Sequence, residues 1–459
     1  MTYAPTPRLE NIRLLLIIVT SDACIIEQGD VPSAFLNSKI DADVYMKQPE
    51  GFSRGVNVAC KLNKGLYGLK QASRLWYSDI SNFTISEMSF IKSNFDDCIF
   101  YRRFDDHYAI IILYVDDILV ASTSVSTVED VMGRYVNRFK IKRMGPISDY
   151  LGITFKYYSK QKIITMNQSV TITKMLQHFD MTNIRPASTP YNPDMVMPPA
   201  NGTDLKLAKK FRSAIGGLLW IARCSRPDIM FIVGNLSQFQ IHPTETHMGA
   251  VKHIMRYLAA TIEACMILKP DLNAKPIIMC DSSFADLSIG LYSTTGFIIF
   301  LFGAPFLWRS IKQKALAMSS TEAEYNAAAE AIKYISFFKR VLEELATALS
   351  KNFNLPFELQ IDSQSCADDI RRGAPNQGRT RFMDLKTNKI IEKFQAGHFT
   401  YKWIAGSNNT ADILTKRIRT VSLFVKHRDT LVSLLPSSAG ECQDTDDVIP
   451  PRMQPLDAK

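Results

Sequence analysis

The sequence predicts a mixed α/β protein built from several domains, and three observations support this fold class. The chain has 459 residues, a length that suggests two to four domains. Hydrophobic residues make up 46% of it, which is enough for packed cores. Short β-rich runs mix with helical patterns in the first third, helices dominate the middle, and strands alternate with helices in the last third.

Residues 1–150 hold the most distinct short elements. Leu14 to Val19 is an apolar run that we interpret as a buried helix or strand, because it is short even for the core of a signal peptide. Residues 62–76 carry glycines and basic residues and predict a loop that enters a helix. An apolar hairpin is expected over 109–121, and residues 139–146 predict a helix end followed by a turn.

Residues 151–270 have a different pattern. A strand is expected at 163–166 and a helix at 170–179. A polar, proline-rich linker over 185–204 separates them from two further helices. The second of these helices has an apolar face formed by Val251, Ile254, Met255 and Leu258.

Residues 271–420 alternate strands and helices, and this order predicts an α/β domain with a mixed sheet. The strands are expected at 276–280, 296–302 and 357–361, with a long helix over 320–341. Residues 421–459 are expected to form a disordered tail, because aspartates and prolines gather near the end of the chain.

Charge and cysteine usage limit the classes of partner. The net charge of +9 suits a nucleic-acid partner, although many unrelated proteins are as basic. The eight cysteines are scattered without a CxxC pair, which argues against a zinc site or a disulfide framework. No apolar run is long enough to cross a membrane, so we expect a soluble, intracellular protein without a membrane partner.

Two adjacent aspartates, Asp116 and Asp117, stand at the tip of the expected hairpin. Carboxylates are costly beside so much Ile, Leu and Val, so we expect cations to be bound there. Divalent metals held by carboxylates serve phosphoryl transfer, and a polymerase palm adds an acid from a neighbouring strand to hold two metals about 3.5–4 Å apart. Asp30 is the candidate for that acid, although a lone Asp before a proline is usually a turn residue.

The residues around these acids resemble the Pol polyprotein of copia-type LTR retrotransposons. Tyr114-Val115-Asp116-Asp117 resembles the YxDD box of reverse transcriptases. Three longer blocks match in fixed order and are far more specific than the box alone. They are Asp30 to Asn37, Val44 to Phe52 and Leu62 to Arg74.

The resemblance implies a role for each matching position. Asp30 and Asp116 are expected to be the main metal ligands, with Asp117 in support because adjacent strand residues point to opposite faces. Phe35 falls where reverse transcriptases place an aromatic gate that excludes the ribose 2′-hydroxyl, and a core phenylalanine is the plain alternative. Gln71 is expected beside the incoming nucleotide.

A second set of acids lies in the last third, where the chain resembles the RNase H domain of the same polyproteins. The resemblance implies that four of these acids bind metal: Asp281, Glu324, Asp362 and Asp412. Glu322 competes with Glu324, but residues two apart do not share a helix face. Glu324 shares its face with small alanines, whereas Glu322 can cap the helix after Ser319 or Ser320.

The resemblance runs from about residue 3 to residue 417 and implies a domain order. We expect a partial reverse transcriptase palm over 1–150 that lacks the fingers, and a thumb or connection region over 151–270. An RNase H-like domain is expected over 271–420. Family members usually have a histidine where Phe382 stands and another near Asn388, and losing them is expected to slow the RNase H step or product release.

The implied function is RNA-directed DNA polymerase with RNase H activity, using two Mg²⁺ ions in each site. The implied partners are an RNA template, an RNA–DNA hybrid and deoxynucleoside triphosphates. We expect the protein in the cytoplasm within virus-like particles, and leave nuclear passage and oligomeric state open. The alternative is a truncated, weakly active or inactive relic, or a co-opted nucleic-acid-binding protein.

Overall fold

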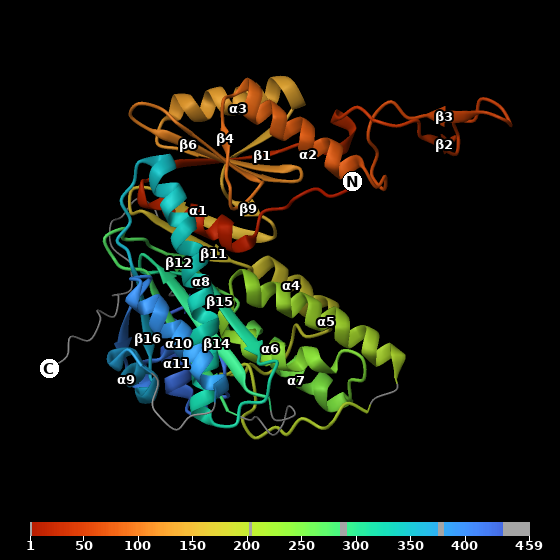
Figure 1. The fold of residues 1–459 in the computed structure, drawn as a ribbon. Helices are drawn as coiled ribbons and strands as arrows, with labels where there is room; N and C mark the ends of the chain where they lie inside the picture. The colour runs from red at the N-terminus through yellow and green to blue at the C-terminus, as the bar shows by residue number, and fades with distance from the viewer. Residues whose placement is uncertain (1, 202–203, 285–291, 375–380, 435–459) are drawn as a thin grey trace.

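A computed structural model of the chain describes residues 2–201, 204–284, 292–374 and 381–434 (Figure 1). Its strands form three large sheets and one small hairpin, and helices pack around the sheets. The α/β fold class expected from the sequence is confirmed. None of the described helices is both long enough and apolar enough to cross a bilayer.

The first sheet, here the N-terminal sheet, has six strands and lies at the top of Figure 1. In spatial order the strands are β4 (Ile91–Lys92), β5 (Ile99–Arg103), β6 (Tyr108–Tyr114), β7 (Asp117–Ser122), β1 (Ile25–Asp30) and β8 (Lys142–Pro146). Its helices are α1 (Leu9–Ser21), α2 (Ala72–Asn82) and α3 (Val125–Phe139). The hairpin of β2 (Tyr45–Lys47) and β3 (Ala59–Lys61) projects away from it (Figure 1).

The middle sheet has five strands and lies beside a group of helices. Its strands in spatial order are β18 (Ser433–Leu434), β12 (Ala264–Leu268), β11 (Ile163–Asn167), β10 (Ile153–Tyr158) and β9 (Asp149–Tyr150). The helices of this region are α4 (Ser169–His178), α5 (Leu205–Cys224), α6 (Met230–Leu236), α7 (Glu245–Ala260) and α11 (Val421–Asp429).

The C-terminal sheet is mixed, as expected, because β13 pairs antiparallel with β14 and parallel with β16. Its strands in spatial order are β15 (Ala304–Lys312), β14 (Thr294–Leu301), β13 (Ile277–Ser283), β16 (Phe357–Ile361) and β17 (Phe399–Trp403). Its helices are α8 (Ser320–Leu349), α9 (Gln364–Arg372) and α10 (Arg381–Gln395).

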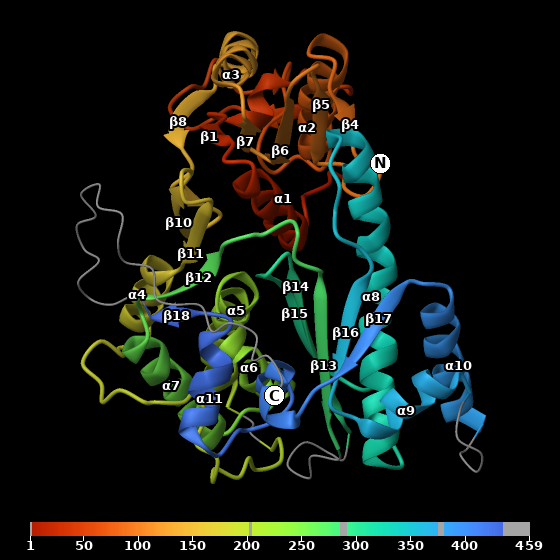
Figure 2. The ribbon, with the colours of Figure 1, turned by 90° about the vertical axis from the view of Figure 1, so that its left-hand side faces the viewer.

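One apolar core passes through all three sheets. It joins Ile110 of the N-terminal sheet, Ile164 of the middle sheet and Phe297 of the C-terminal sheet in a single cluster of buried residues. A second, smaller core covers the other face of the N-terminal sheet beneath α2 and α3. The long helix α8 rises from the C-terminal sheet to the N-terminal sheet (Figure 2), where Ser93 Oγ donates to Glu344 Oε1 at 2.8 Å.

Two segments differ from the sequence-based expectation. Residues 142–146 form strand β8 rather than a turn, because Gly29 and Asp30 of β1 offer them a free edge to pair with. Residues 421–434 do not form the expected disordered tail, since α11 and β18 occupy most of this segment. Phe424, Leu431 and Val432 are buried in the main core, and this burial holds the segment in place. Residues 435–459 lie outside the described residues.

Candidate active sites

The structure brings the three acids of the first predicted site together at one edge of the N-terminal sheet. Strands β6 and β7 form the expected hairpin, with Val115 and Asp116 in its turn. Strand β1 lies beside β7, and Asp30 stands opposite Asp117 in that ladder. Asp30, Asp116 and Asp117, here the first acid site, are all half-buried.

Two hydrogen bonds hold the tip of this hairpin. Val31 N donates to Asp116 O at 2.8 Å, and Trp76 Nε1 donates to Val115 O at 2.5 Å. Val115 has a φ of 58°, a left-handed conformation that is costly for a β-branched residue, by about 1–3 kcal/mol. The two bonds offset that cost and fix the position of the aspartates. The importance of Trp76 was not foreseen from the sequence, which shows only an aromatic residue in the loop-to-helix block.

The carboxylates of the first acid site repel one another. Burial raises the pKa of Asp117 to about 6, and the neighbouring charges of Asp116 and Asp30 add to the shift. Among the described residues, neither Lys nor Arg forms an ion pair with any of the three acids. Three half-buried carboxylates that have no ion pair among the described residues leave this edge of the sheet negatively charged, which favours the binding of cations.

The two predicted nucleotide-binding residues lie on elements next to this site. Phe35 belongs to the short helix η1 (Ala34–Asn37), which follows β1, and its ring lies 4.5 Å from the ring of Tyr67. A Cβ on Gly65 would come within 2.6 Å of Phe35 O, so only glycine permits this close approach of the loop. Gln71 stands immediately before α2, the helix whose Trp76 reaches the hairpin tip.

Three acids of the second predicted site converge on the C-terminal sheet. Asp281 lies in β13, Asp362 follows the parallel neighbour β16, and Glu324 lies near the start of α8. Each of the three offers a carboxylate oxygen within 4.8 Å of the others. Asp281 is only 2% exposed, so the cluster extends into the protein interior.

The side chains of Glu324 and Glu322 point in different directions, as their spacing on the helix predicts. Glu324 Oε1 accepts from Ser282 Oγ at 2.9 Å and so faces β13. Glu322 instead completes the cap of α8, because its carboxylate accepts from Met318 N and its own N–H donates to Ser319 Oγ. Ala327, Ala328 and Ala331 on the inner face of α8 are buried, which lets the helix approach the sheet.

Asp412 joins the second site through a lysine. It lies in the short helix η7 (Thr410–Leu414), and Lys416 Nζ is 2.9 Å from Asp412 Oδ1 and 3.5 Å from Asp281 Oδ2. Thr415 Oγ1 also donates to Asp281. Sequence reasoning did not identify Lys416, although a lysine four residues after an aspartate is a recognisable pairing signal. We refer to Asp281, Glu324, Asp362 and Asp412 as the second acid site.

Close packing places η7 against the sheet. Gly296 in β14 stands opposite Asp281 in β13, and a Cβ there would lie 2.5 Å from Thr415 Cγ2 and 2.9 Å from Leu414 Cβ. Asn409 Nδ2 donates to Cys280 O at 2.8 Å and secures the start of η7. The glycine and the asparagine together set the position of Asp412 and Lys416.

The acids of the second site are harder to ionise than isolated carboxylates. Burial raises the pKa of Asp281, followed by repulsion from Asp412. Burial also raises the pKa of Glu324, with repulsion from Asp281 and Asp362. Four buried or half-buried acids facing one lysine leave an excess of acidic groups at this place. A cluster of oxygen ligands with this excess fits divalent cations of the Mg²⁺ class.

The chain is similar to known proteins over most of its length. The family profile described as "Reverse transcriptase (RNA-dependent DNA polymerase)" matches residues 1–193. The Pol polyprotein of transposon TNT 1-94 from Nicotiana tabacum is 32% identical over 90% of this chain and 31% of its own length. That of transposon RE1 from Arabidopsis thaliana is 30% identical over 90% of this chain and 28% of its own length.

A shorter relative is matched from end to end. The putative transposon Ty5-1 protein of Saccharomyces cerevisiae is 31% identical over 309 residues, which are 67% of this chain and 100% of the relative. By contrast, the chain spans about 30% of the length of the plant polyproteins.

Solved structures with similar folds were also found. A foamy viral protease-reverse transcriptase in complex with an RNA/DNA hybrid aligns with 86% of this chain and 45% of its own, at a TM-score of 0.43 and 12% identity. LC11-RNase H1 aligns with 31% of this chain and 92% of its own, at a TM-score of 0.25 and 19% identity.

Proposed function

The chain belongs to the reverse transcriptase family of retrotransposon Pol polyproteins and represents its reverse transcriptase and RNase H region, and from this premise we propose that it has two catalytic centres. The first acid site would extend a DNA strand on an RNA or DNA template. The second would cut the RNA strand of an RNA–DNA hybrid. The proposed partners are therefore the template, the hybrid and deoxynucleoside triphosphates.

At the first acid site, Asp30 and Asp116 would hold the metal ions and Asp117 would support them. Bound Mg²⁺ supplies activation of the attacking hydroxyl and neutralisation of the phosphates. The protein contributes position: the Val31 and Trp76 hydrogen bonds fix the hairpin tip, so the two acids keep their spacing. The ring of Phe35, supported by Tyr67, would exclude the 2′-hydroxyl of a ribonucleotide.

At the second acid site, Asp281, Glu324 and Asp362 would hold the metal ions, with Asp412 at the margin. Ser282 orients Glu324, and Thr415 orients Asp281, so both carboxylates keep a defined direction before any ligand arrives. Lys416 keeps two of the acids in place by neutralising part of their charge.

The convergence of the second acid site is the observation that carries the proposal. Its three central acids come from positions 281, 324 and 362, which lie within β13, near the start of α8 and directly after β16, and yet their oxygens lie within 4.8 Å of one another. Acids gathered at this density in a buried place are costly unless they bind cations. The similarity to retrotransposon Pol polyproteins over most of the chain supports a role in phosphoryl transfer for this cluster.

The proposal is tested by hybrid cleavage and primer extension with Mg²⁺. Glu324→Gln is expected to abolish hybrid cleavage, by a factor of about 10² or more, whereas Glu322→Gln is the matched control because it changes the same residue type on the same helix. Asp116→Asn should abolish primer extension and leave hybrid cleavage intact. Cleavage by Glu324→Gln at the parent's rate would show that the second acid site is wrongly assigned.

One observation favours a second candidate, a nucleic-acid-binding protein without turnover. Lys416 already lies between Asp281 and Asp412, where it supplies a positive charge from the protein itself. If it stayed there, the cluster would be a structural ion pair rather than a metal site. Binding of the hybrid without cleavage in the parent protein, in Mg²⁺ or Mn²⁺, would support this candidate.

A further inference from the structure

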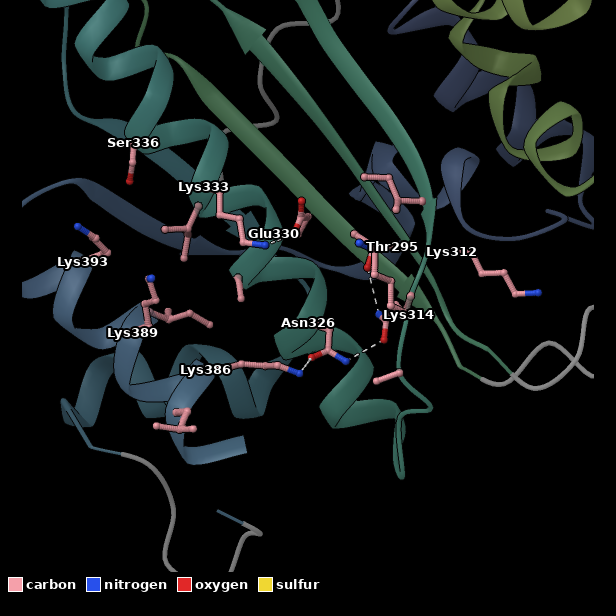
Figure 3. A pocket seen from close by; sticks show the side chains of 17 residues that line it. Thr295, Lys312, Lys314, Asn326, Glu330, Lys333, Ser336, Lys386, Lys389 and Lys393 are labelled. Carbon is pink, nitrogen blue, oxygen red and sulfur yellow. Dashed lines mark hydrogen bonds and ion pairs between the residues drawn. The ribbon is translucent and has the colours of Figure 1, made fainter. Parts of the chain in front are cut away.

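A basic pocket opens on the C-terminal region, beside the second acid site and outside it. Its volume is about 740 Å³, and it lies between the end of β15, the middle of α8 and the exposed side of α10 (Figure 3). Six lysines line it and a single acid, Glu330, faces them. The lysines are Lys312, Lys314, Lys333, Lys386, Lys389 and Lys393, and we call this feature the lysine pocket.

A chain of hydrogen bonds fixes the walls of the lysine pocket relative to one another. Lys386 of α10 donates to Asn326 Oδ1 of α8, and Asn326 Nδ2 donates to Gln313 Oε1 at 2.8 Å. Gln313 Nε2 donates in turn to Thr295 Oγ1 of β14 at 3.0 Å. Helix, helix and sheet are therefore tied together around the pocket, so it is preformed rather than created by a ligand.

Three of the six lysines have an ion pair or a side-chain hydrogen bond in the described part of the chain, and the other three have none. Lys333 pairs with Glu330, Lys386 binds Asn326 and Lys312 Nζ donates to Gln238. Lys314, Lys389 and Lys393 form neither an ion pair nor a side-chain hydrogen bond among the described residues. Ammonium groups gathered in this way repel each other, which is unfavourable unless an anion binds among them.

The arrangement of the lysines favours an extended anion over a small one. Lys386, Lys389 and Lys393 follow one another along α10, opposite Lys333 on α8 (Figure 3). Seven residues of helix rise by about 10 Å, which exceeds the size of one phosphate. The floor between the lysines is apolar and includes Ile332 and Ile390. Charged groups over an apolar floor suit a polymer that alternates phosphates with sugars.

The lysine pocket adjoins the second acid site through the sheet. Thr295 lines the pocket and stands opposite Ser282 in the β13–β14 ladder. Ser282 donates to Glu324. Neighbouring strands lie about 4.8 Å apart, so the inner end of the pocket begins one strand away from the acids.

We propose that the lysine pocket binds the sugar-phosphate backbone of a nucleic-acid strand and holds the substrate of the second acid site from the side. The proposal rests on the proposed function, because it takes the hybrid as that substrate. The pocket contributes affinity and direction but no chemistry. Its contacts are with phosphates, so it reads no base sequence.

The test is binding of a fluorescein-labelled RNA–DNA hybrid to the full chain in EDTA, followed by fluorescence anisotropy over a series of salt concentrations. Lys389→Glu/Lys393→Glu is expected to weaken binding about tenfold and to lower the slope of log K against log salt by roughly two. Lys206→Glu/Lys209→Glu is the matched control, because it places the same charge change on exposed residues of α5. The neutral pair Lys389→Gln/Lys393→Gln should give a smaller loss of affinity with a similar change in slope.

The outcomes separate this proposal from the proposed function. If the parent and Lys389→Glu/Lys393→Glu bind the hybrid with equal affinity and equal salt dependence, the proposed role of the lysine pocket is wrong, even if the parent cuts the hybrid. A loss of binding in both pocket variants but not in the control would support it, even if the parent cuts nothing. Displacement of the hybrid by poly-glutamate at equal charge concentration would overturn it in favour of an acidic protein partner.

Discussion

Asp117 shows how a single carboxylate reports on its neighbours. It lies in β7 opposite Asp30 and next to Asp116, and burial, together with the charges of these two acids, raises its pKa from 3.8 to about 6. A carboxyl whose pKa is higher in the folded state holds its proton more tightly when folded. Folding is therefore favoured by this group below pH 4, and the advantage disappears as the pH rises through 6.

We expect Asp117→Asn to remove this pH dependence. Without metal, the variant should gain stability relative to the parent as the pH rises from 4 to 7, by about 1 kcal/mol after allowance for the exposure of the side chain. Urea unfolding in EDTA at several pH values measures the difference. Asp149→Asn changes an aspartate outside the cluster and serves as the control. If the difference in unfolding free energy between the parent and Asp117→Asn stays constant across this pH range, the pKa of Asp117 is not raised.

The sequence was informative about residues wherever a side chain had a chemical signature. Asp116 and Asp117 were conspicuous because they interrupt an apolar run. Glu324 was selected by the family resemblance, and its place on the helix face separated it from Glu322. Trp76 and Lys416 were not identified, since a buried donor to a backbone carbonyl and a lysine among acids depend on contacts between distant segments. Such contacts follow from the fold and leave little trace in local pattern.

Among the elements, η7 shows how a glycine determines where the segment that carries Asp412 can lie. It packs against β14 at Gly296, at a distance that leaves no room for a side chain. The contact includes a backbone atom, Ala411 O, which is 3.1 Å from the place where a Cβ would stand. A side chain at position 296 would therefore clash with this backbone atom, and only a movement of η7, together with Asp412, would remove the clash.

We expect Gly296→Ala to cost about 1–3 kcal/mol of stability by overpacking and to reduce hybrid cleavage more strongly than it reduces primer extension. Gly234→Ala is the control, because a Cβ on that helical glycine of α6 would meet nothing within 4 Å. Urea unfolding and the two activity assays measure the effects. A Gly296→Ala protein as stable and as active in cleavage as the parent would show that η7 tolerates displacement.

Helices and strands were predicted correctly where the hydrophobic periodicity was strong. The prediction failed where pairing with a distant strand determined the structure. The apolar run of β6 and β7 and the long pattern of α8 were recognised, and α8 extends the expected helix to Leu349. Strand β8 was taken for a turn, since Gly145 and Pro146 are turn residues by composition. Its strand character comes from pairing with the edge of β1, which no local pattern contains.

At the scale of the whole molecule, Trp308 joins all three parts of the chain. It belongs to β15 of the C-terminal sheet, and its ring lies 4.0 Å from the guanidinium of Arg13 in α1. Its Nε1 donates to Ala222 O of α5 at 2.9 Å. Arg13 is fully buried, and burial lowers the pKa of its guanidinium to about 10. The cation–π contact with Trp308 offsets part of the free-energy cost of burying this charge.

We expect Trp308→Ala to cost about 3–5 kcal/mol and to uncouple the unfolding of the N-terminal and C-terminal sheets. In the parent, tryptophan fluorescence and far-UV circular dichroism should report one coincident transition. In Trp308→Ala, hydrogen exchange should show that one sheet opens before the other. Trp220→Ala, at a tryptophan that is 37% exposed, is the control. Coincident transitions in both variants would mean that other contacts dominate the coupling.

The apolar core that passes through the three sheets affects how the protein responds to proteolysis. In a protein whose domains are joined only by flexible linkers, a protease can remove one domain while the others stay folded and functional. Within the described residues, one buried cluster connects the sheets that carry the two proposed centres, so a cut or a lesion that opens one region exposes the others too. Its survival in a cell should therefore be all or none, with intact molecules and small peptides but few stable halves.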